Sequence, residues 1–501
     1  MTSAGSVSTP EKAPVAVQKT KKPLEKYRIW FALVAVVVGV IVFLLPLGLG
    51  QNAKITLAAF AFTVVMWAFE VMPLGITAVL FSVILTLLIP QKVMGPAVTF
   101  NGFTNDTFWL ILGSFLLGEA TVRTGLVERI ALSLMRRGGS SYTRVMIYVW
   151  ISQFILGALV PSGTVRIAMY IPIIVGIVEG FNAAPDSNLA AGVMMHVYWS
   201  SILGATIWYT GTNLNPVAME ISKQAGGIEP SFLTWFVWML FPSILLTVGS
   251  FFIIQKIFPP EKEYLTGNQK GNSAGEKVSI VDERLKALGP WKAEEKRALA
   301  YFVVCVGLWV SEPLHGISTS WVAILIGVLL FLPGIGVLKK KSLNNISWGT
   351  LLLLGVALGM TKIIKAVHLD TWMTKTLLAP ILNPLCAFGP IGLVFGVCII
   401  TALIHFLISA SSAETAMLTP LVTKYAANAG FNPSLAGMAV ARSSMGVFLF
   451  PYQTLPLAAI WGTGYMDMKK CLKIMSCMSL FSIVWITALG PYYNWIMTVL
   501  P

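Results

Sequence analysis

Pro161-Ser162-Gly163-Thr164-Val165-Arg166 interrupts one long apolar stretch of the chain, and Ser409-Ala410-Ser411-Ser412-Ala413-Glu414 interrupts another about half a chain later. Each break is followed by the same frame, Ala-Met-x-x-Pro, which ends at Pro172 after the first and at Pro420 after the second. Backbone that leaves the helix at bilayer depth exposes N–H and C=O groups that lipid cannot satisfy, so such breaks persist only beside protein or water. A matched pair of breaks in the two halves of a membrane protein points to a transporter's substrate site.

The composition is typical of a protein that crosses a membrane many times. Of the 501 residues, 56% are hydrophobic and only 11% are charged, whereas about a quarter of the residues in an average soluble protein are charged. Many stretches approach the length that a helix needs to cross a bilayer. We therefore expect an all-α polytopic membrane protein with about 11 transmembrane helices and two re-entrant hairpins in two inverted repeats.

Charge, cysteine and histidine content exclude several other classes. The net charge of +14 comes from basic residues gathered in short loops, which is a topology signal and not a nucleic-acid surface. The five cysteines contain no CxxC pair and predict no disulfide framework. The four histidines have no metal-ligand spacing, so we expect neither a metal site nor another cofactor.

Polar segments divide the chain into a tail, a first helix, two repeats and a linker. The first apolar run is too long for a signal-peptide core and lacks a cleavage site after it. The expected divisions are a disordered cytoplasmic tail (1–28), the first transmembrane helix (29–49), repeat 1 (52–256, with scaffold helices in 52–122 and hairpin and transport helices in 145–256), a cytoplasmic linker (257–296) and repeat 2 (297–501, with scaffold helices in 298–375 and hairpin and transport helices in 384–501).

Short echoes connect the two repeats. Trp67-x-x-Glu70 returns as Trp309-x-x-Glu312, and Leu110-x-x-Gly113 returns as Leu352-x-x-Gly355. The echoes and the breaks follow in the same order, which favours a duplication over coincidence. The positive-inside rule places the N-terminus and the linker in the cytoplasm and the C-terminus outside, with the halves inverted. Lys362, Lys365 and Lys375 then fall outside, which an interfacial helix common to both repeats would explain.

Each break can bind an anion. A hairpin that enters the membrane halfway presents helix N-termini at its tip, where free N–H groups and the helix dipole favour negative charge. Hydroxyl donors are added by Ser162, Thr164, Ser411 and Ser412, and Gly163 lets a ligand approach the backbone. Two tips that meet at the midplane could hold the two ends of a dicarboxylate. The alternative is a pair of helix kinks without a ligand.

Arg166 is the most informative single residue. An arginine in the membrane interior costs several kcal/mol unless it is solvated or paired. We interpret Arg166 as a fixed positive charge beside the substrate, with a snorkelling or salt-bridged arginine as the alternative. Glu414 would pair with Arg166 or with another base, and His405 is either a neutral donor or a core histidine. All three are candidates for compensating charge.

A second polar break follows each hairpin. The first covers residues 209–216 and the second residues 450–456. Unwound backbone at such places can orient a substrate or bind cations, although ordinary loop ends look similar. The candidate substrate-binding residues here are Thr212, Asn213, Pro451 and Thr454. Glu70 and Glu312 stand at helix ends, and we expect them to be interfacial or structural.

At these residues the chain resembles the divalent anion:sodium symporter (DASS) family. That family carries Ser-Asn-Thr motifs at the tips of two inverted re-entrant hairpins, ten residues before a proline. Here Ser162-Gly163-Thr164 precedes Pro172 and Ala410-Ser411-Ser412 precedes Pro420 by that spacing, while both asparagines are replaced. The linker sequence Leu288-Gly289-Pro290-Trp291 is also similar. Sodium-binding members use the hairpin backbone with the motif serine and asparagine as ligands, so the replacements argue against sodium coupling. The run from His405 to Thr415 and Arg166 resemble the family's exchanger branch of citrate:succinate antiporters and plastid 2-oxoglutarate/malate translocators.

The resemblance implies a transporter and not an enzyme. It implies a homodimer in the cytoplasmic membrane, in which each protomer has a static scaffold and an elevator-like transport domain that holds both hairpins. We predict sodium-independent exchange of C4/C5 dicarboxylates such as succinate, malate, fumarate or 2-oxoglutarate, with a sodium-coupled symporter as the first alternative. An anion channel and an intramembrane hydrolase are weaker alternatives, the latter because no nucleophile and base are predictably spaced.

Overall fold

A computed structural model describes residues 27–139, 141–266 and 279–501 of the chain. Nearly all of the predicted tail and part of the predicted linker therefore lie outside the described residues. Every regular element in the described part is a helix, as the composition predicts.

The first half of the chain begins with helices that pack against one another and continues into the first interrupted segment. Its elements are α1 (Arg28–Leu44), α2 (Gln51–Ala68), α3 (Leu74–Leu88), α4 (Gln91–Met94), α5 (Pro96–Thr99), the 3-10 helix η2 (Asn101–Thr104), α6 (Asp106–Thr124), α7 (Leu126–Arg136), α8 (Tyr142–Leu159), α9 (Gly163–Gly180), α10 (Asn188–Ala205), η3 (Tyr209–Gly211), α11 (Leu214–Gln224) and α12 (Phe232–Ile257).

The linker and the second half repeat this order of long helix, bent arm, hairpin and broken helix. Their elements are α13 (Lys262–Thr266), α14 (Ser279–Ala287), α15 (Ala293–Val310), α16 (Glu312–His315), α17 (Thr319–Leu329), η5 (Lys340–Asn345), α18 (Trp348–Ala366), α19 (Leu369–Met373), the π-helical η6 (Thr374–Leu378), α20 (Ala379–Cys386), α21 (Gly389–His405), α22 (Ser411–Asn428), α23 (Pro433–Gly446), η7 (Pro451–Gln453), α24 (Leu455–Trp461), α25 (Met468–Ala488) and α26 (Gly490–Val499).

Helix length explains why simple counting of membrane spans falls below the expected number. Five described helices are long and apolar enough to cross a membrane, or six if the bent pair α6–α7 is one span, and four shorter apolar helices accompany them. Helices α8 and α9, which flank the first break, are both among the five. The broken segments α11 and α24 have 11 and 7 residues and are too short to cross a bilayer alone.

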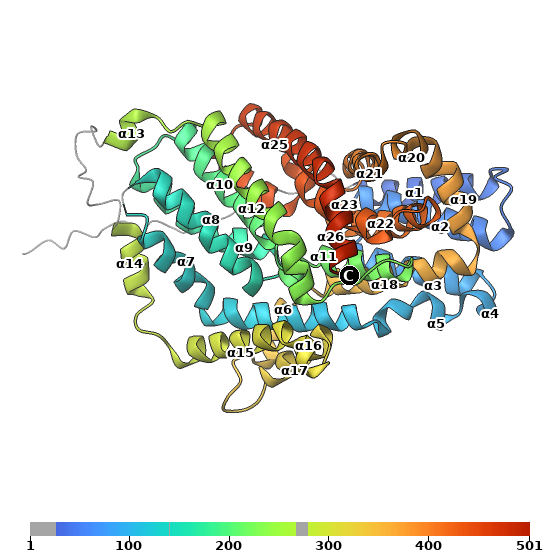
Figure 1. Cartoon of the computed structure of the whole chain (residues 1–501), viewed down its shortest axis with the longest axis horizontal. Helices are drawn as coiled ribbons and strands as arrows, with labels where there is room; N and C mark the ends of the chain where they lie inside the picture. Colours follow the sequence, from blue (N-terminus) through green and yellow to red (C-terminus); the bar gives the residue numbers. More distant parts are fainter. Residues whose placement is uncertain (1–26, 140, 267–278) are drawn as a thin grey trace, which may run out of the picture.

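The two hairpins lie toward opposite ends of the molecule. Hairpin 1 consists of α8 and α9, and hairpin 2 consists of α21 and α22. Figure 1 places α8 and α9 on the side of α7, α13 and α14, and places α21 and α22 on the side of α19 and α20. The predicted breaks are confirmed, because α8 ends at Leu159 before α9 begins at Gly163, and α21 ends at His405 before α22 begins at Ser411.

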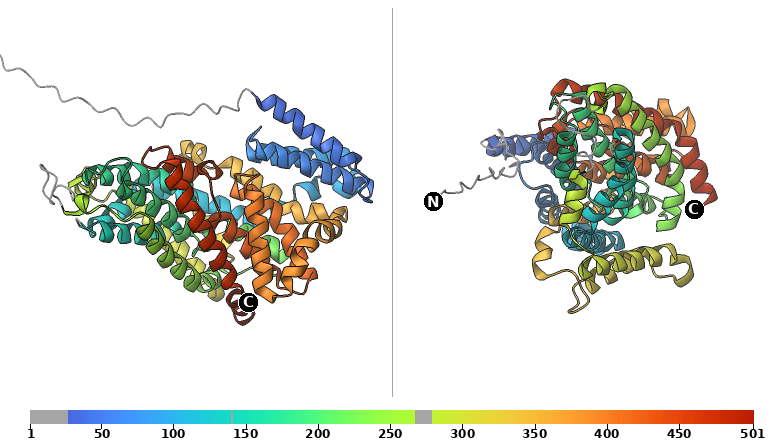
Figure 2. Two further views of the ribbon diagram at one scale, coloured as in Figure 1. Left: turned by 90° about the horizontal axis from the view of Figure 1, so that it is seen from above. Right: turned by 90° about the vertical axis from the view of Figure 1, so that its left-hand side faces the viewer.

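Six helices that we call the scaffold group (α2, α3, α6, α15, α17 and α18) pack against one another and meet the hairpins where α18 contacts α22 and α6 contacts α8. Figure 2 shows α15 and α17 on the outer side of α6. The Leu-x-x-Gly echo has a packing reason, because a Cβ atom on Gly113 would lie 2.5 Å from the Ala323 carbonyl carbon, and one on Gly355 would collide with the Phe103 ring. Glycine at these positions lets α6 approach α17 and lets α18 approach η2.

The end of the linker is fastened to α7. Arg129 of α7 donates from Nε to both carboxylate oxygens of Glu295 at 3.0 and 3.1 Å, and both side chains are buried. The same guanidinium donates to the backbone carbonyls of Leu288, Gly289 and Pro290 and lies 5.3 Å from the ring centre of Trp291. The linker sequence that resembles the DASS family therefore wraps around one buried arginine.

Candidate substrate-binding site

One cavity of about 470 Å³ brings both hairpin tips together with the scaffold group. Its lining includes most of the residues that the sequence predicts for the site. On the hairpin side these are Ser162, Gly163, Thr164, Arg166, Thr212, Asn213, Ser411, Ser412 and Thr454. The two breaks are 249 positions apart in sequence, as Ser162 and Ser411 show, yet they face one space.

Each tip presents free backbone donors to the cavity. At the start of α9 the amides of Val165 and Arg166 are already engaged by Ser162, and at the start of α22 the amides of Ala413 and Glu414 are engaged by Ala410. Within residues 141–266 and 279–501, no acceptor meets the amides of Gly163, Thr164, Ser411 and Ser412. Four N–H groups at two helix N-termini form a strong anion site.

A hydrogen bond joins the first half of the chain to hairpin 2 at the cavity wall. Asn213 Nδ2 donates to Ser412 Oγ at 3.2 Å. Thr454 Oγ1 caps α24 by accepting from the Leu457 amide at 3.2 Å, and it lies 3.3 Å from the Tyr198 hydroxyl. Thr212 Oγ1 accepts from the Leu214 amide at 3.3 Å. The unwound segments are thus held by their own hydroxyl and amide side chains.

Arg166 is almost fully buried, with 1% of its surface exposed, and its guanidinium is surrounded by oxygen atoms of the backbone. It donates to the carbonyl of Val160, to the carbonyl of Ser201 at 2.8 Å and, more weakly, to that of Gly211 at 3.5 Å. Nε also lies 3.4 Å from Ser201 Oγ. No carboxylate forms an ion pair with Arg166 among the described residues. Its charge is therefore not offset by a carboxylate of the described chain.

Three predicted site residues lie behind the cavity wall. His405, Glu414 and Pro451 are buried but do not line the cavity. Glu414 does not pair with Arg166. Its Oε2 lies 2.6 Å from Nδ1 of His405, the last residue of α21. Glu414 thus has its partner within hairpin 2, whereas Arg166 of hairpin 1 contacts carbonyls that follow α8 and that belong to α10 and η3.

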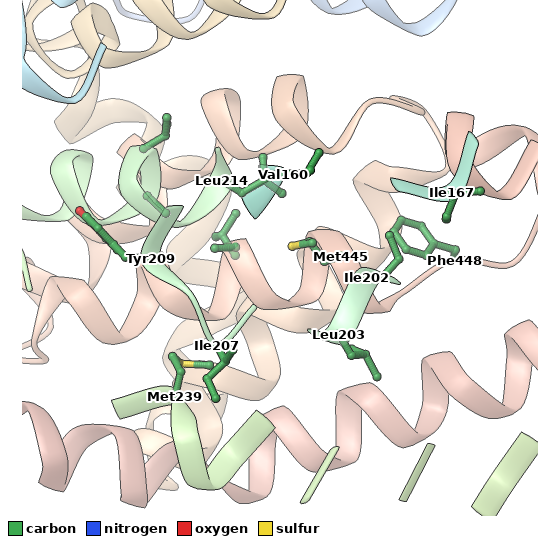
Figure 3. Close-up of a cluster of buried hydrophobic side chains, with 14 of the residues drawn as sticks. Val160, Ile167, Ile202, Leu203, Ile207, Tyr209, Leu214, Met239, Met445 and Phe448 are labelled. Carbon is green, nitrogen blue, oxygen red and sulfur yellow. The ribbon is translucent and has the colours of Figure 1, made fainter. Parts of the chain in front are cut away.

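Apolar side chains close the rest of the hairpin side. Val160, Ile202, Leu214, Met445 and Phe448 line the cavity and belong to the buried cluster in Figure 3. Such a wall lowers the local dielectric and strengthens every charged contact made inside it.

The scaffold group contributes a wall that the sequence reasoning missed. Glu70, which follows α2, and Glu119 of α6 line the cavity, so Glu70 lies at the cavity wall as well as at the helix end where the sequence places it. Asn345 Nδ2 donates to Glu119 Oε1 at 2.7 Å, and residues Ile346 and Ser347 continue this wall into α18. The echo Trp67-x-x-Glu70 was the available signal. Two carboxylates on the scaffold wall would push an anion toward the hairpin tips.

The chain is similar in sequence to a described protein family and to several named proteins. Residues 26–500 match the family described as the sodium:sulfate symporter transmembrane region. A "membrane protein" of Cupriavidus necator is 27% identical over 78% of this chain and 77% of its own length. The sodium-dependent dicarboxylate transporter SdcS of Staphylococcus saprophyticus is 26% identical over 93% of this chain and 91% of its own, and that of Staphylococcus aureus strain USA300 is 25% identical over 95% and 92%.

Two solved structures share the fold at low sequence identity. The YdaH transporter of Alcanivorax borkumensis aligns with a TM-score of 0.56 at 15% identity, over 94% of this chain and 99% of its own. MtrF of Neisseria gonorrhoeae aligns with a TM-score of 0.50 at 15% identity, over 94% and 95%. The all-helical polytopic fold predicted from the breaks is confirmed by these likenesses.

The family match spans nearly the whole chain, and the cavity unites the two motifs on which the resemblance rests. The chain therefore belongs to the sodium:sulfate symporter, or DASS, family of secondary transporters.

Proposed function

We propose that this protein carries C4/C5 dicarboxylates such as succinate, malate, fumarate or 2-oxoglutarate across the cytoplasmic membrane. The observation that carries the proposal is the pair of hairpin tips, each with two free amides and a serine or threonine hydroxyl, facing one cavity beside the unpaired charge of Arg166. Two separated anion sites suit a ligand with a carboxylate at each end. The dicarboxylate named for the staphylococcal relatives agrees with this choice.

We further propose that transport is sodium-independent. Carbonyl oxygens of unwound helices are the groups with which such transporters coordinate sodium. At hairpin 1 the carbonyls of Val160, Ser201 and Gly211 already accept hydrogen bonds from Arg166. The positive charge that sodium supplies elsewhere is here tethered to the chain. The names of the relatives support a second candidate, a sodium-coupled dicarboxylate symporter.

Exchange follows from the same fixed charge. A guanidinium that cannot leave makes the empty site positive, and moving that charge through the low-dielectric interior of the membrane is costly. A bound dianion offsets the charge, so the site moves readily only when it is loaded. The protein would then swap one dicarboxylate for another and not carry net flux. An anion channel would lack this requirement.

An elevator movement of the hairpins against the scaffold group is consistent with the contacts around the cavity. The scaffold wall lies at the end of α6 that continues into α7. At the other end of α6, Asn105 donates to Glu220 of α11 at 2.6 Å, and Gln224 donates to the Leu358 carbonyl of α18 at 3.2 Å. We propose that these contacts close the outer side while the cavity faces the cytoplasm, with a cytoplasmic N-terminus, an external C-terminus and a homodimeric assembly.

Thermal-shift measurements on the purified protein test the substrate class. Succinate, malate, fumarate, 2-oxoglutarate, citrate and sulfate are compared with acetate, because a ligand stabilises the state that binds it. We expect stabilisation by one or more dicarboxylates and none by acetate. Stabilisation by sulfate alone, or by none of these anions, would reject the proposal.

The hairpin hydroxyls give a quantitative prediction. Ser162→Ala, Thr164→Val and Ser412→Ala should each raise the apparent KM for dicarboxylate, since each deletes a charge-assisted hydrogen bond with a cost of about 1–3 kcal/mol. Uptake into proteoliposomes at matched protein amounts is the measurement. Ser187→Ala is the control, because Ser187 Oγ only caps α10 by accepting from the Ala190 amide at 3.1 Å. An unchanged KM in all three cavity variants would remove the tips from the site.

A further inference from the structure

A buried histidine–glutamate pair stands behind the tip of hairpin 2. His405 is the last residue of α21 and Glu414 lies in the first turn of α22. Their Nδ1 and Oε2 atoms are 2.6 Å apart, and the two side chains are 1% and 0% exposed. A distance this short between a ring nitrogen and a carboxylate oxygen requires a proton between them. The pair therefore holds at least one proton.

One nitrogen of the pair has no hydrogen-bond partner among the described residues. His405 Nε2 is buried and unpartnered, whereas the Ser444 hydroxyl lies beside the Glu414 carboxylate. With Nε2 deprotonated the pair carries one negative charge, and with Nε2 protonated it is neutral. Buried charge without compensation is costly, so a single proton separates two states of very different energy.

Three structural connections link the pair to the cavity: a ring contact, a shared helix and hydrogen bonds through Gln453. The ring of His405 meets the ring of Phe448 edge-on, with centroids 4.9 Å apart, and Phe448 lines the cavity. Ser411 and Ser412, which present the free amides, begin the same helix that carries Glu414. Gln453 Nε2 donates to the His405 carbonyl at 3.2 Å, while Gln453 Oε1 accepts from the amides of Leu449 and Phe450 in the unwound segment. An anion that binds the tips lies close to the pair in a low dielectric.

Other titratable groups near the pair have their contacts elsewhere. Arg442 of α23 and Cys398 of α21 act on Tyr493 of α26. The other titratable groups on α21, α22 and the helices that pack against them also have partners elsewhere or are exposed. Those with partners are Lys424 with Asp370, Glu220 with Asn105, Lys223 with Glu229, Cys386 with Tyr425, Cys471 near Tyr198, Lys470 with the Asp186 carbonyl and Tyr492 with the Trp238 carbonyl. The exposed ones are Lys362, Lys365, Lys375, Lys469, Lys473 and Cys477. Within the described chain, His405 is the titratable group that acts on the Glu414 carboxylate.

We propose that the His405–Glu414 pair is a proton-binding site that takes up one proton from solvent, at His405 Nε2, when a dicarboxylate binds the hairpin tips. The inference rests on the proposed dicarboxylate function and adds a proton to the transported load. The direction of the pH dependence follows from the charges of the ligand and the pair. A dianion stabilises the neutral, doubly protonated pair over the negative one, so binding draws in a proton and affinity rises as the pH falls.

Isothermal titration calorimetry of fumarate binding in two buffers of different ionisation enthalpy tests the inference, because both fumarate carboxyls are fully ionised at neutral pH. We expect the observed enthalpy to change with buffer enthalpy at a slope of about one proton per ligand for the unmodified protein. In Glu414→Gln and in His405→Gln the slope should fall to near zero while fumarate still binds. His315→Gln, at the end of α16 and outside both hairpins, is the matched histidine control and should keep the slope.

The possible failures are distinguishable. Fumarate binding without a buffer-dependent enthalpy in the unmodified protein would overturn the proton site and leave the dicarboxylate function standing. An undiminished slope in both pair variants would place the proton on another group and also overturn the inference. Absence of binding by any dicarboxylate would reject the function on which the inference rests. The slope and the pH dependence of affinity in the unmodified protein need no variant, so misfolding of a variant does not protect the inference.

Discussion

Replacing Arg166 with glutamine is expected to weaken dicarboxylate binding by about 30- to 5000-fold, the equivalent of about 2–5 kcal/mol for a buried charged partner that is removed. Arg166 is buried, has no acidic partner among the residues described, and lines the cavity from the first turn of α9. Glutamine keeps a hydrogen-bond donor for the surrounding carbonyls but removes the charge that offsets the dianion.

The variant Arg166→Lys distinguishes the effect of the positive charge from the effect of the guanidinium shape. Lysine keeps the charge but replaces a planar fork of five donors with a point charge, so it cannot reach the carbonyls of Val160, Ser201 and Gly211 together. We expect partial exchange with a raised KM. Any transport that remains in Arg166→Gln should include efflux without external dicarboxylate, since the empty site no longer carries charge.

Efflux of preloaded labelled succinate, with and without external succinate, measures both effects. Arg123→Gln is the control, because Arg123 also donates to a backbone carbonyl, that of Val337 at 2.6 Å, but does not line the cavity. If Arg166→Gln exchanges succinate like the unmodified protein and shows no leak, Arg166 only stabilises the unwound backbone.

Breaking the Arg129–Glu295 pair is expected to destabilise the protein by about 3–5 kcal/mol, because either single substitution leaves a buried charge without its partner. Arg129→Ala also removes donors from the carbonyls of Leu288, Gly289 and Pro290. The linker end would detach from α7, which joins the scaffold group to hairpin 1. We therefore expect a large drop in the unfolding midpoint.

Thermal unfolding in detergent, followed by intrinsic fluorescence, is the measurement. Arg136→Ala is the matched control in the same helix. Its pair with Asp282 spans 2.9 Å but is 61% and 26% exposed, so its loss should cost at most about 1 kcal/mol. Equal effects of Arg129→Ala and Arg136→Ala would contradict a special role for the buried pair. The double variant Arg129→Leu/Glu295→Leu should recover part of the loss, since no charge is left unpaired.

The sequence predicted the helix breaks well, because the membrane leaves no other structure for polar residues within an apolar run. Polar residues within an apolar run must mark broken helices, so both breaks could be placed within a few residues of the observed gaps, 160–162 and 406–410. Free amides at the starts of α9 and α22 follow from the breaks themselves. The meeting of the two tips followed from their repetition in the two halves.

Partners across the fold could not be read from the sequence, because they depend on which helix faces which. Glu414 was expected to pair with Arg166 or with another base, and the turn between α21 and α22 makes His405 that partner. The carbonyls around Arg166 come from the end of α8, from α10 and from η3, at sequence distances of 6, 35 and 45 residues. The position of Glu70 and Glu119 at the cavity wall depends on where α2 and α6 lie relative to the hairpins.

For Pro451, the sequence motif did not predict correctly whether the residue contacts the cavity. The second unwound segment lines the cavity with Tyr452, Thr454 and Leu455, whereas Pro451 faces the protein interior. A short irregular segment has no fixed period, so the direction of each side chain cannot be deduced from spacing as it can in a helix or strand. Membership of the polar segment was predictable, but contact with the cavity was not.

The central claim is that the tethered charge of Arg166 replaces sodium, and counterflow in sodium-free medium tests it most directly. Proteoliposomes that contain purified protein and unlabelled succinate are diluted into labelled succinate with either sodium or choline as the external cation. The account predicts equal accumulation of label in both media, and none in liposomes without internal dicarboxylate. Accumulation that requires sodium, or that rises sigmoidally with sodium concentration, would contradict it and establish a sodium-coupled symporter like the one named for the staphylococcal relatives.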